Sequence, residues 1–355
     1  MFNLNDLVRE NIQKLVPYSS ARCEFTDQAS IFLDANENSY GSPLNKTYNR
    51  YPDPQQTQIK KRISAIKGVP VKNIFLGNGS DEIIDILFRA FCRPGVDHVM
   101  IVPPTYGRYE VLANVNDIEV KKVNLTPDYQ LDLESIAEAI NQNTKLIFIC
   151  SPNNPTGNSI NRQDIETILA NFNGLVVIDE AYINYSKQKT FIQELTEYAN
   201  LVVIQTLSKA WGLAGLRVGM ALASEEIIEV LNKIKPPYNI NEASQQLVLD
   251  ALQQLDQVNH WIKETVLERE MLCAQLQKLF FVEHIFPSDA NFILVRTNDS
   301  QFIYTYLSEK GIIVHNRSKV DLCEDCLRIT IGTPAENSAL ITALIDLNLH
   351  QVNKI

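Results

Sequence analysis

Short apolar runs separated by helical patterns constrain the fold of this 355-residue chain more than any other feature. Five runs are typical of buried strands, and they lie at residues 74–76, 99–102, 145–150, 174–178 and 201–204. Helical spacing follows the first run, where one face carries Ile84, Leu87, Phe88 and Phe91. Strands that alternate with helices form mostly parallel sheets covered on both faces. The sequence therefore predicts a large α/β domain with a mostly parallel sheet flanked by helices.

The pattern changes after about residue 222, where long helices replace the alternation. Helices are predicted at residues 225–235, 242–279, 302–310 and 335–347, and strands at 292–296, 312–314 and 327–331. This segment is typical of a smaller α+β domain. Near the N-terminus, residues 5–14 predict a short helix and residues 31–41 a short strand that leads into a polar turn. We therefore expect three parts, namely an arm that joins the small domain, a large domain and a small C-terminal domain, at residues 1–30, 31–240 and 241–355.

Charge and composition exclude several classes of partner. The chain carries 32 basic and 42 acidic residues, a net charge of −10, without any basic block, so neither nucleic acid nor an anionic membrane is an expected partner. No apolar run reaches membrane-spanning length, and the polar N-terminus lacks a signal-peptide pattern. The six cysteines are scattered, and the pair Cys323 and Cys326 lacks the second pair or the histidines of a zinc site. We expect no metal, reduced thiols and a cytoplasmic location.

Five residues that could contact a ligand lie where the predicted strands and their turns end. The set is Gly79, Tyr106, Asn154, Asp179 and Lys209. Sheets of this kind bind ligands at the carboxyl ends of their strands. Lys209 is the most informative member, because a lysine just past a core strand must find a partner or lose its proton unless its side chain reaches the surface.

Lys209 fits covalent binding of an aldehyde cofactor, pyridoxal 5′-phosphate (PLP). The cofactor ring nitrogen stays protonated only beside a buried carboxylate, which Asp179 is placed to supply. Asn154 and Tyr182 would donate hydrogen bonds to the phenolate oxygen, and Tyr106 would stack on the ring. The phosphate group would be held by Arg217, Ser208, Gly79, Ser80 and Asp81. Each residue alone has an ordinary structural role, such as helix cap or turn former, so the prediction depends on all of them occurring together.

Three motifs connect this chemistry to a family. Ser-Pro-Asn-Asn-Pro-Thr-Gly at 151–157, Asp-Glu-Ala-Tyr at 179–182 and Ser-Lys-Ala-Trp-Gly-Leu-Ala-Gly-Leu-Arg at 208–217 resemble the PLP-dependent aminotransferases of fold type I in order and spacing. Other stretches resemble the histidinol-phosphate aminotransferases within that group, and they lie at 17–22, 34–41, 50–54, 77–82, 103–107 and 327–333. The matches run almost end to end.

This resemblance implies a homodimeric enzyme that transfers the amino group of L-glutamate to imidazole acetol phosphate. The products would be L-histidinol phosphate and 2-oxoglutarate, in histidine biosynthesis. Lys209 would act as base and then acid, with Asp179 and Tyr182 completing the catalytic set. Arg328 would hold the carboxylate of glutamate and the phosphate of histidinol phosphate in turn. The resemblance also implies that Tyr51 reaches the cofactor phosphate of the other subunit and that the substrate pocket is lined by Tyr18, Asn36 and Glu37.

One position departs from the family pattern. After Ile312-Ile313-Val314, where many relatives place an arginine that binds substrate phosphate, this chain has His315, with Arg317 two residues further on. Alternation along a strand would put both side chains on one side, so Arg317 could substitute as the phosphate ligand. His315 is otherwise an ordinary polar residue at a strand end.

Threonine-phosphate decarboxylases and aromatic aminotransferases share the core motifs, and a non-catalytic binding module is a further alternative.

Overall fold

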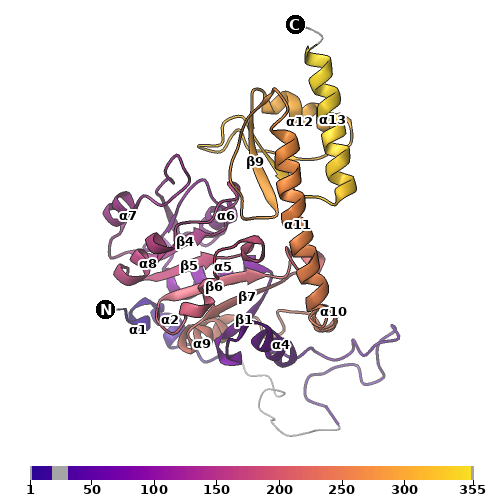
Figure 1. Cartoon of the computed structure of the whole chain (residues 1–355). Helices are drawn as coiled ribbons and strands as arrows, with labels where there is room; N and C mark the ends of the chain where they lie inside the picture. Colours follow the sequence, from indigo (N-terminus) through magenta and orange to yellow (C-terminus); the bar gives the residue numbers. More distant parts are fainter. Residues whose placement is uncertain (1, 18–30, 353–355) are drawn as a thin grey trace.

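A computed structural model describes residues 2–17 and 31–352. The expected substrate residue Tyr18 and most of the motif at 17–22 lie outside the described residues. The described chain builds two sheets, one of seven strands and one of four, each with its own hydrophobic core (Figure 1). The two sheets correspond to the α/β and α+β parts that the sequence predicts.

The large sheet has the strand order β1-β7-β6-β5-β4-β2-β3. In chain order its strands are β1 (Ile74–Asn78), β2 (His98–Ile101), β3 (Glu119–Lys122), β4 (Thr144–Cys150), β5 (Leu175–Asp179), β6 (Leu201–Thr206) and β7 (Val218–Ala223). Neighbouring strands pair in parallel except at β7, which is antiparallel to both β1 and β6. The prediction of a mostly parallel sheet is confirmed, and β7 is a strand that the sequence reasoning missed.

Burial on both faces explains why the strands read as continuous apolar runs. Along β5, Val176 and Ile178 pack into one core cluster while Leu175 and Val177 pack into another on the opposite face. Helices cover both faces: α4 (Thr57–Lys67), α5 (Ser80–Phe91), α6 (Arg108–Val115), α7 (Leu133–Ala139), α8 (Arg162–Asn171), α9 (Glu225–Ile234) and α10 (Glu242–Ala251). Short 3-10 helices lie at Val71–Asn73, Ile183–Tyr185, Phe191–Glu194 and Ala214–Leu216.

The smaller sheet is antiparallel, with the order β10-β11-β9-β8. Its strands are β8 (Val282–Ile285), β9 (Phe292–Thr297), β10 (His315–Asn316) and β11 (Cys326–Thr330). Its core also includes side chains of three helices, namely α11 (Leu255–Leu276), α12 (Ser300–Glu309) and α13 (Pro334–Val352). Figure 1 shows α11 running from the large sheet to the smaller one, so this helix links the two parts.

The described part of the predicted arm packs on the large sheet and not on the small part. It forms two helical turns, α1 (Leu4–Leu7) and α2 (Glu10–Gln13), instead of one helix. Leu7, Val8 and Ile12 are buried in the same core cluster as α5, and the Arg9 backbone N–H donates to the carbonyl of Ala90 at 3.1 Å. Apolar burial against α5 therefore fixes these residues on the large sheet.

Three predicted elements differ from the structure. Residues 31–41 form no strand, since Ile31 and Leu33 are 75% and 82% exposed and pair with no strand of the described chain. The helix predicted at 242–279 is two helices, because Gln254 leaves the helical region and lets Leu252 and Val258 both remain in the large core. The strand predicted at 312–314 begins only at His315, where pairing with β11 starts.

Two absences concern the described residues only. Within residues 2–17 and 31–352, no helix is long and apolar enough to cross a membrane. The five cysteines in this part of the chain, Cys92, Cys150, Cys273, Cys323 and Cys326, are free thiols.

Candidate active site

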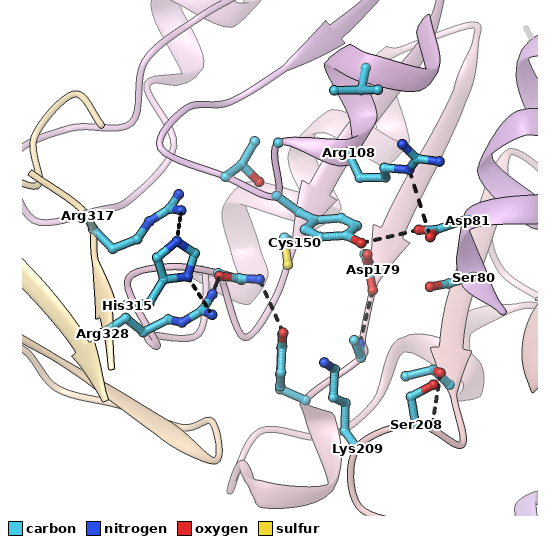
Figure 2. Close-up of a pocket in the computed structure, with 18 of the residues that line it drawn as sticks. Ser80, Asp81, Arg108, Cys150, Asp179, Ser208, Lys209, His315, Arg317 and Arg328 are labelled. Atoms are coloured by element: carbon cyan, nitrogen blue, oxygen red, sulfur yellow. Dashed lines mark hydrogen bonds and ion pairs between the residues drawn. The ribbon is translucent and has the colours of Figure 1, made fainter. Parts of the chain in front are cut away.

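A cavity of about 490 Å³ opens where the carboxyl ends of the large sheet face the smaller sheet (Figure 2). Ten residues expected at the site line it together: Ser80, Asp81, Tyr106, Asn154, Asp179, Tyr182, Ser208, Lys209, Arg217 and Arg328. His315 and Arg317 lie on the same wall as Arg328. The cavity also has lining residues that sequence reasoning did not select, among them Thr105, Arg108, Cys150 and Thr206. Segments more than 200 residues apart therefore build one pocket.

Asp179 ends β5 as a fully buried carboxylate. Its oxygens accept hydrogen bonds from the Tyr109 hydroxyl at 2.7 Å and from the Ala181 backbone N–H at 3.1 Å. Burial raises the pKa of the Asp179 carboxyl, although these two hydrogen bonds oppose the shift. A buried carboxylate of this kind is suited to a cationic partner in the cavity. Tyr109 is a residue that sequence reasoning missed, because a tyrosine on the buried face of a helix reads as core packing.

Lys209 follows β6, the strand next to β5, and its ammonium points into the cavity. The Nζ atom lies 5.5 Å from the centre of the Tyr182 ring. Burial lowers the pKa of Lys209, and the nearby Arg328 guanidinium lowers it further. A lysine with a lowered pKa is a better nucleophile and base near neutral pH than an ordinary surface lysine.

A glycine turn leads from β1 into α5 and leaves the N-terminus of this helix without a side-chain cap. Gly79 has φ +76°, and a Cβ there would come within 2.6 Å of the Arg217 guanidinium. Glycine is thus required both for the backbone conformation and for the approach of Arg217. Free N–H groups beside an arginine make an anion site. The Asp81 carboxylate lies 3.8 Å from Arg217 and 3.9 Å from Arg108, and it accepts a 3.2 Å hydrogen bond from Tyr106.

Asn154 joins the two parts of the chain across the cavity. Its Nδ2 donates to the Tyr182 hydroxyl at 3.2 Å, and its Oδ1 accepts from Arg328 at 2.6 Å. The Arg328 guanidinium lies 5.3 Å from the ring of Phe292. The Tyr182 and Asn154 side chains are buried, and burial raises the pKa of Tyr182. A guanidinium from the smaller sheet is therefore held in a fixed direction over the strand ends.

His315 lies between two arginines on the same wall (Figure 2). Its Nδ1 is 3.1 Å from the guanidinium of Arg328, and its Nε2 is 3.3 Å from that of Arg317. The strand register explains the first contact, because His315 pairs directly with Arg328 across β10 and β11. Both His315 and Arg317 therefore reach the cavity.

Three expected residues lie elsewhere in this chain. Asn36, Glu37 and Tyr51 line a second cavity of about 530 Å³. There Glu37 accepts from the Arg50 guanidinium at 2.6 Å and from the Tyr51 backbone N–H at 2.7 Å, and the Tyr51 ring stacks on Tyr238 at 4.5 Å. A single chain does not bring these residues to Lys209. Among the described residues, no group of three or more His, Cys, Asp or Glu could hold a metal ion.

Comparisons with known proteins identify the family. The model of the family described as aminotransferase class I and II matches residues 29–344. Histidinol-phosphate aminotransferase from Parabacteroides distasonis is 52% identical over 349 residues, which cover 98% of this chain and 100% of the relative. Histidinol-phosphate aminotransferase from Cytophaga hutchinsonii is 51% identical over 343 residues, which cover 97% of this chain and 99% of the relative. The solved structure of histidinol-phosphate aminotransferase from Clostridium acetobutylicum has a TM-score of 0.77 at 25% identity, covering 85% of this chain and 91% of that one. The chain therefore belongs to the class I and II aminotransferase family.

Proposed function

We propose that this protein catalyses the PLP-dependent transfer of an amino group between L-glutamate and imidazole acetol phosphate. The products are L-histidinol phosphate and 2-oxoglutarate, and the pathway is histidine biosynthesis. The observation that carries the proposal is the placement of Asp179 and Lys209 at the ends of adjacent strands, facing one cavity. The chain is about half identical to histidinol-phosphate aminotransferases over nearly its full length, and this similarity supports the choice of substrate.

The donors around the cavity fit PLP. Asp179 is a buried carboxylate for the ring nitrogen, and Asn154 and Tyr182 are polar groups for the phenolate oxygen. Tyr106 supplies an aromatic face for the ring. The cradle for the phosphate is the uncapped turn at Gly79 and Ser80 together with Arg217 and Ser208. Asp81 contributes only its backbone N–H to that cradle, since its carboxylate would repel a phosphate. When bound, the cofactor withdraws electrons from the substrate α-carbon and so makes its proton acidic.

The residues of this chain then move one proton. Lys209 takes the proton from the substrate α-carbon and later returns it, which requires an amine that is partly deprotonated at working pH. The lowered pKa of Lys209 supports this role. Arg328 binds the carboxylate of glutamate in one half-reaction and the phosphate of histidinol phosphate in the other. Asn154 keeps Arg328 directed at the cavity through their 2.6 Å contact.

A homodimer completes the site. Tyr51, with Asn36 and Glu37, lies in a cavity separate from Lys209 of its own chain, so in the dimer Tyr51 serves the cofactor phosphate of the other subunit while the other two line its substrate pocket. Exposed apolar side chains in this segment, Ile31 and Leu33, support burial against a second copy.

The arm, the large domain and the small domain divide near residues 30 and 240, and the enzyme works in the cytoplasm.

The first prediction tests the reaction directly. Holoenzyme mixed with L-histidinol phosphate is expected to lose the visible absorbance of its cofactor within a single turnover. Phenylalanine and threonine phosphate should react at least about 100-fold more slowly, because neither fills both the anion site and the rest of the pocket. Rapid reaction with phenylalanine would instead indicate an aromatic aminotransferase, and release of carbon dioxide from threonine phosphate would indicate a decarboxylase. No visible band in the purified protein would refute the proposed cofactor.

A second prediction concerns the phosphate cradle. Arg217→Ala should weaken PLP binding about 10- to 100-fold, because a charge-assisted hydrogen bond contributes roughly 1.5–3 kcal/mol. The measurement is the dissociation constant of PLP from equilibrium dialysis of the variant. The matched control is Arg89→Ala, which removes an exposed arginine from α5, the helix whose N-terminus forms part of the cradle. Unchanged affinity in Arg217→Ala would remove this residue from the cradle.

A further inference from the structure

Three nitrogen-rich side chains meet on one wall of the cavity without an acidic partner. His315 contacts Arg328 through Nδ1 at 3.1 Å and Arg317 through Nε2 at 3.3 Å. Among the described residues, no carboxylate pairs with either arginine, and the buried Nε of Arg317 has no hydrogen-bond partner. The two carboxylates of the cavity, Asp81 and Asp179, lie on the opposite side in Figure 2. The cluster is therefore built to receive an anion.

Of the three side chains, only His315 can change the number of hydrogen bonds that it donates. Guanidinium groups only donate, and a neutral imidazole accepts at one nitrogen and donates at the other. One of the two His315 nitrogens thus carries a proton that points toward a guanidinium donor. An anion among these groups would accept from that N–H and resolve the conflict. A protonated ring would present two donors and would match an anion of higher charge.

Two substrate groups of different charge use this wall under the proposed function. A carboxylate carries one negative charge, whereas a phosphate ester carries nearly two above its second pKa of about 6. The arginines stay charged throughout the working pH range. Only His315 can change the charge of the wall between the two half-reactions.

We propose that His315 matches the charge of this site to its ligand. It takes up one proton when the phosphate of a substrate binds and stays neutral when a carboxylate binds. The inference rests on the proposed function for the identity of the two ligands. It assigns to His315 a role in substrate binding that depends on pH.

The direction of the pH effect follows from the groups that face His315. These are Arg317, which follows β10, and Arg328 on β11. The other titratable residues that line the cavity are Asp81, Tyr106, Arg108, Asp179, Tyr182, Lys209 and Arg217. Helix α12 packs on β10 through Gln301 and Asn316 and adds no charge to the cavity. Burial and the guanidinium groups of Arg328 and Arg317 lower the pKa of His315, which favours the neutral ring in the ligand-free site. A bound dianion raises this pKa again. Phosphate affinity must then fall as pH rises, by up to about tenfold per pH unit for one linked proton.

The test uses holoenzyme and two amine-free ligands between pH 7.0 and 8.5, where a phosphate ester stays dianionic. Calorimetry in buffers of different ionisation enthalpy measures the dissociation constant and the proton uptake for an imidazolyl-propyl phosphate and for glutarate. We expect uptake approaching one proton and a strongly pH-dependent affinity for the phosphate. Glutarate should show little proton uptake and less than about a threefold change in affinity over the same range.

Variants separate a charge role from a structural one. His315→Arg should keep phosphate binding and lose both the proton uptake and the pH slope, because its charge is fixed. His315→Asn should bind the phosphate about tenfold or more weakly, also without a slope. His260→Asn, which removes an exposed histidine from α11, should match the wild type.

The outcomes distinguish this inference from the proposed function. No proton uptake with the phosphate, or an unchanged slope in His315→Arg, overturns the inference even if histidinol phosphate still reacts in the half-reaction. Failure of the phosphate ligand to bind overturns it as well. Failure of histidinol phosphate to react, with normal proton-linked binding of the phosphate, would overturn only the proposed reaction.

Discussion

Replacing Lys209 with alanine is expected to lower the turnover number by at least about 10³-fold while the protein still folds. Under the proposed mechanism the expected loss is large, because the variant would lack both the amine that holds the cofactor and the group that moves the substrate proton. Proton transfer alone contributes roughly 10²- to 10⁴-fold. Folding should survive because Lys209 is a cation among Arg328 and Arg217, so removing it relieves repulsion. Steady-state turnover and the thermal midpoint of the cofactor-free protein measure the two effects.

Two controls make the Lys209 result specific. Lys187→Ala, an exposed lysine in the loop after Tyr185, should leave turnover unchanged. Adding a small primary amine to the Lys209→Ala protein should restore part of the half-reaction with histidinol phosphate, since the missing group is then supplied from solution. Near-normal turnover in Lys209→Ala would disprove the proposed mechanism.

Replacing Asp179 with asparagine should lower turnover roughly 10²- to 10⁴-fold. Removing one partner of a buried ion pair costs about 3–5 kcal/mol, and 1.36 kcal/mol corresponds to a tenfold change in rate. Under the proposed mechanism this loss is expected because a neutral amide would not keep the cofactor ring nitrogen protonated. Single-turnover measurement of the half-reaction with histidinol phosphate reports the effect without interference from product release.

The stability of the same variant should behave differently. Burial raises the pKa of Asp179 in the folded protein, so its ionised form opposes folding at pH values above its unfolded pKa. Asparagine removes that buried charge but cannot accept both hydrogen bonds, because its Nδ2 only donates. Its Oδ1 can accept from the Ala181 N–H, and the Tyr109 hydroxyl must then turn and accept from Nδ2. The two effects offset each other, and the thermal midpoint of the cofactor-free protein should change by only a few degrees. A large drop in the midpoint at pH 7.5 would show that Asp179 stabilises the fold instead.

Most of the large sheet could be predicted from sequence because its strands are buried on both faces. The alternation of Val176 and Ile178 with Leu175 and Val177 between two cores requires an unbroken apolar run, which is a local signal. Within the described residues, the segment at 31–41 pairs with no strand and leaves Ile31 and Leu33 largely exposed, so its predicted strand does not form. Local patterns predict structure well where a core buries both faces of a segment, and poorly in exposed segments that no core holds in place.

The part of the candidate site at the strand ends of the large sheet was also predictable in outline. Asp179 and Lys209 each follow a recognisable core strand, and parallel pairing of neighbouring strands brings strand ends to one edge. Tyr109 was not predictable in this way, because its hydroxyl contact with Asp179 spans 70 positions and leaves no local pattern. Asn154 and Arg328, which are 174 positions apart, were each selected from sequence, but their 2.6 Å contact was not.

The sequence by itself determined the buried parallel strands of the large sheet, the lysine and the carboxylate that follow two of them, and the histidine at position 315, because each depends on residue type and near neighbours. Only the tertiary structure decided that the smaller sheet meets the large one at this edge. It also decided that both nitrogens of His315 face guanidinium groups and that Tyr51 lies in a separate cavity of its own chain. The physical reason is that such contacts depend on strand register and on the packing of distant segments, which no stretch of sequence encodes alone.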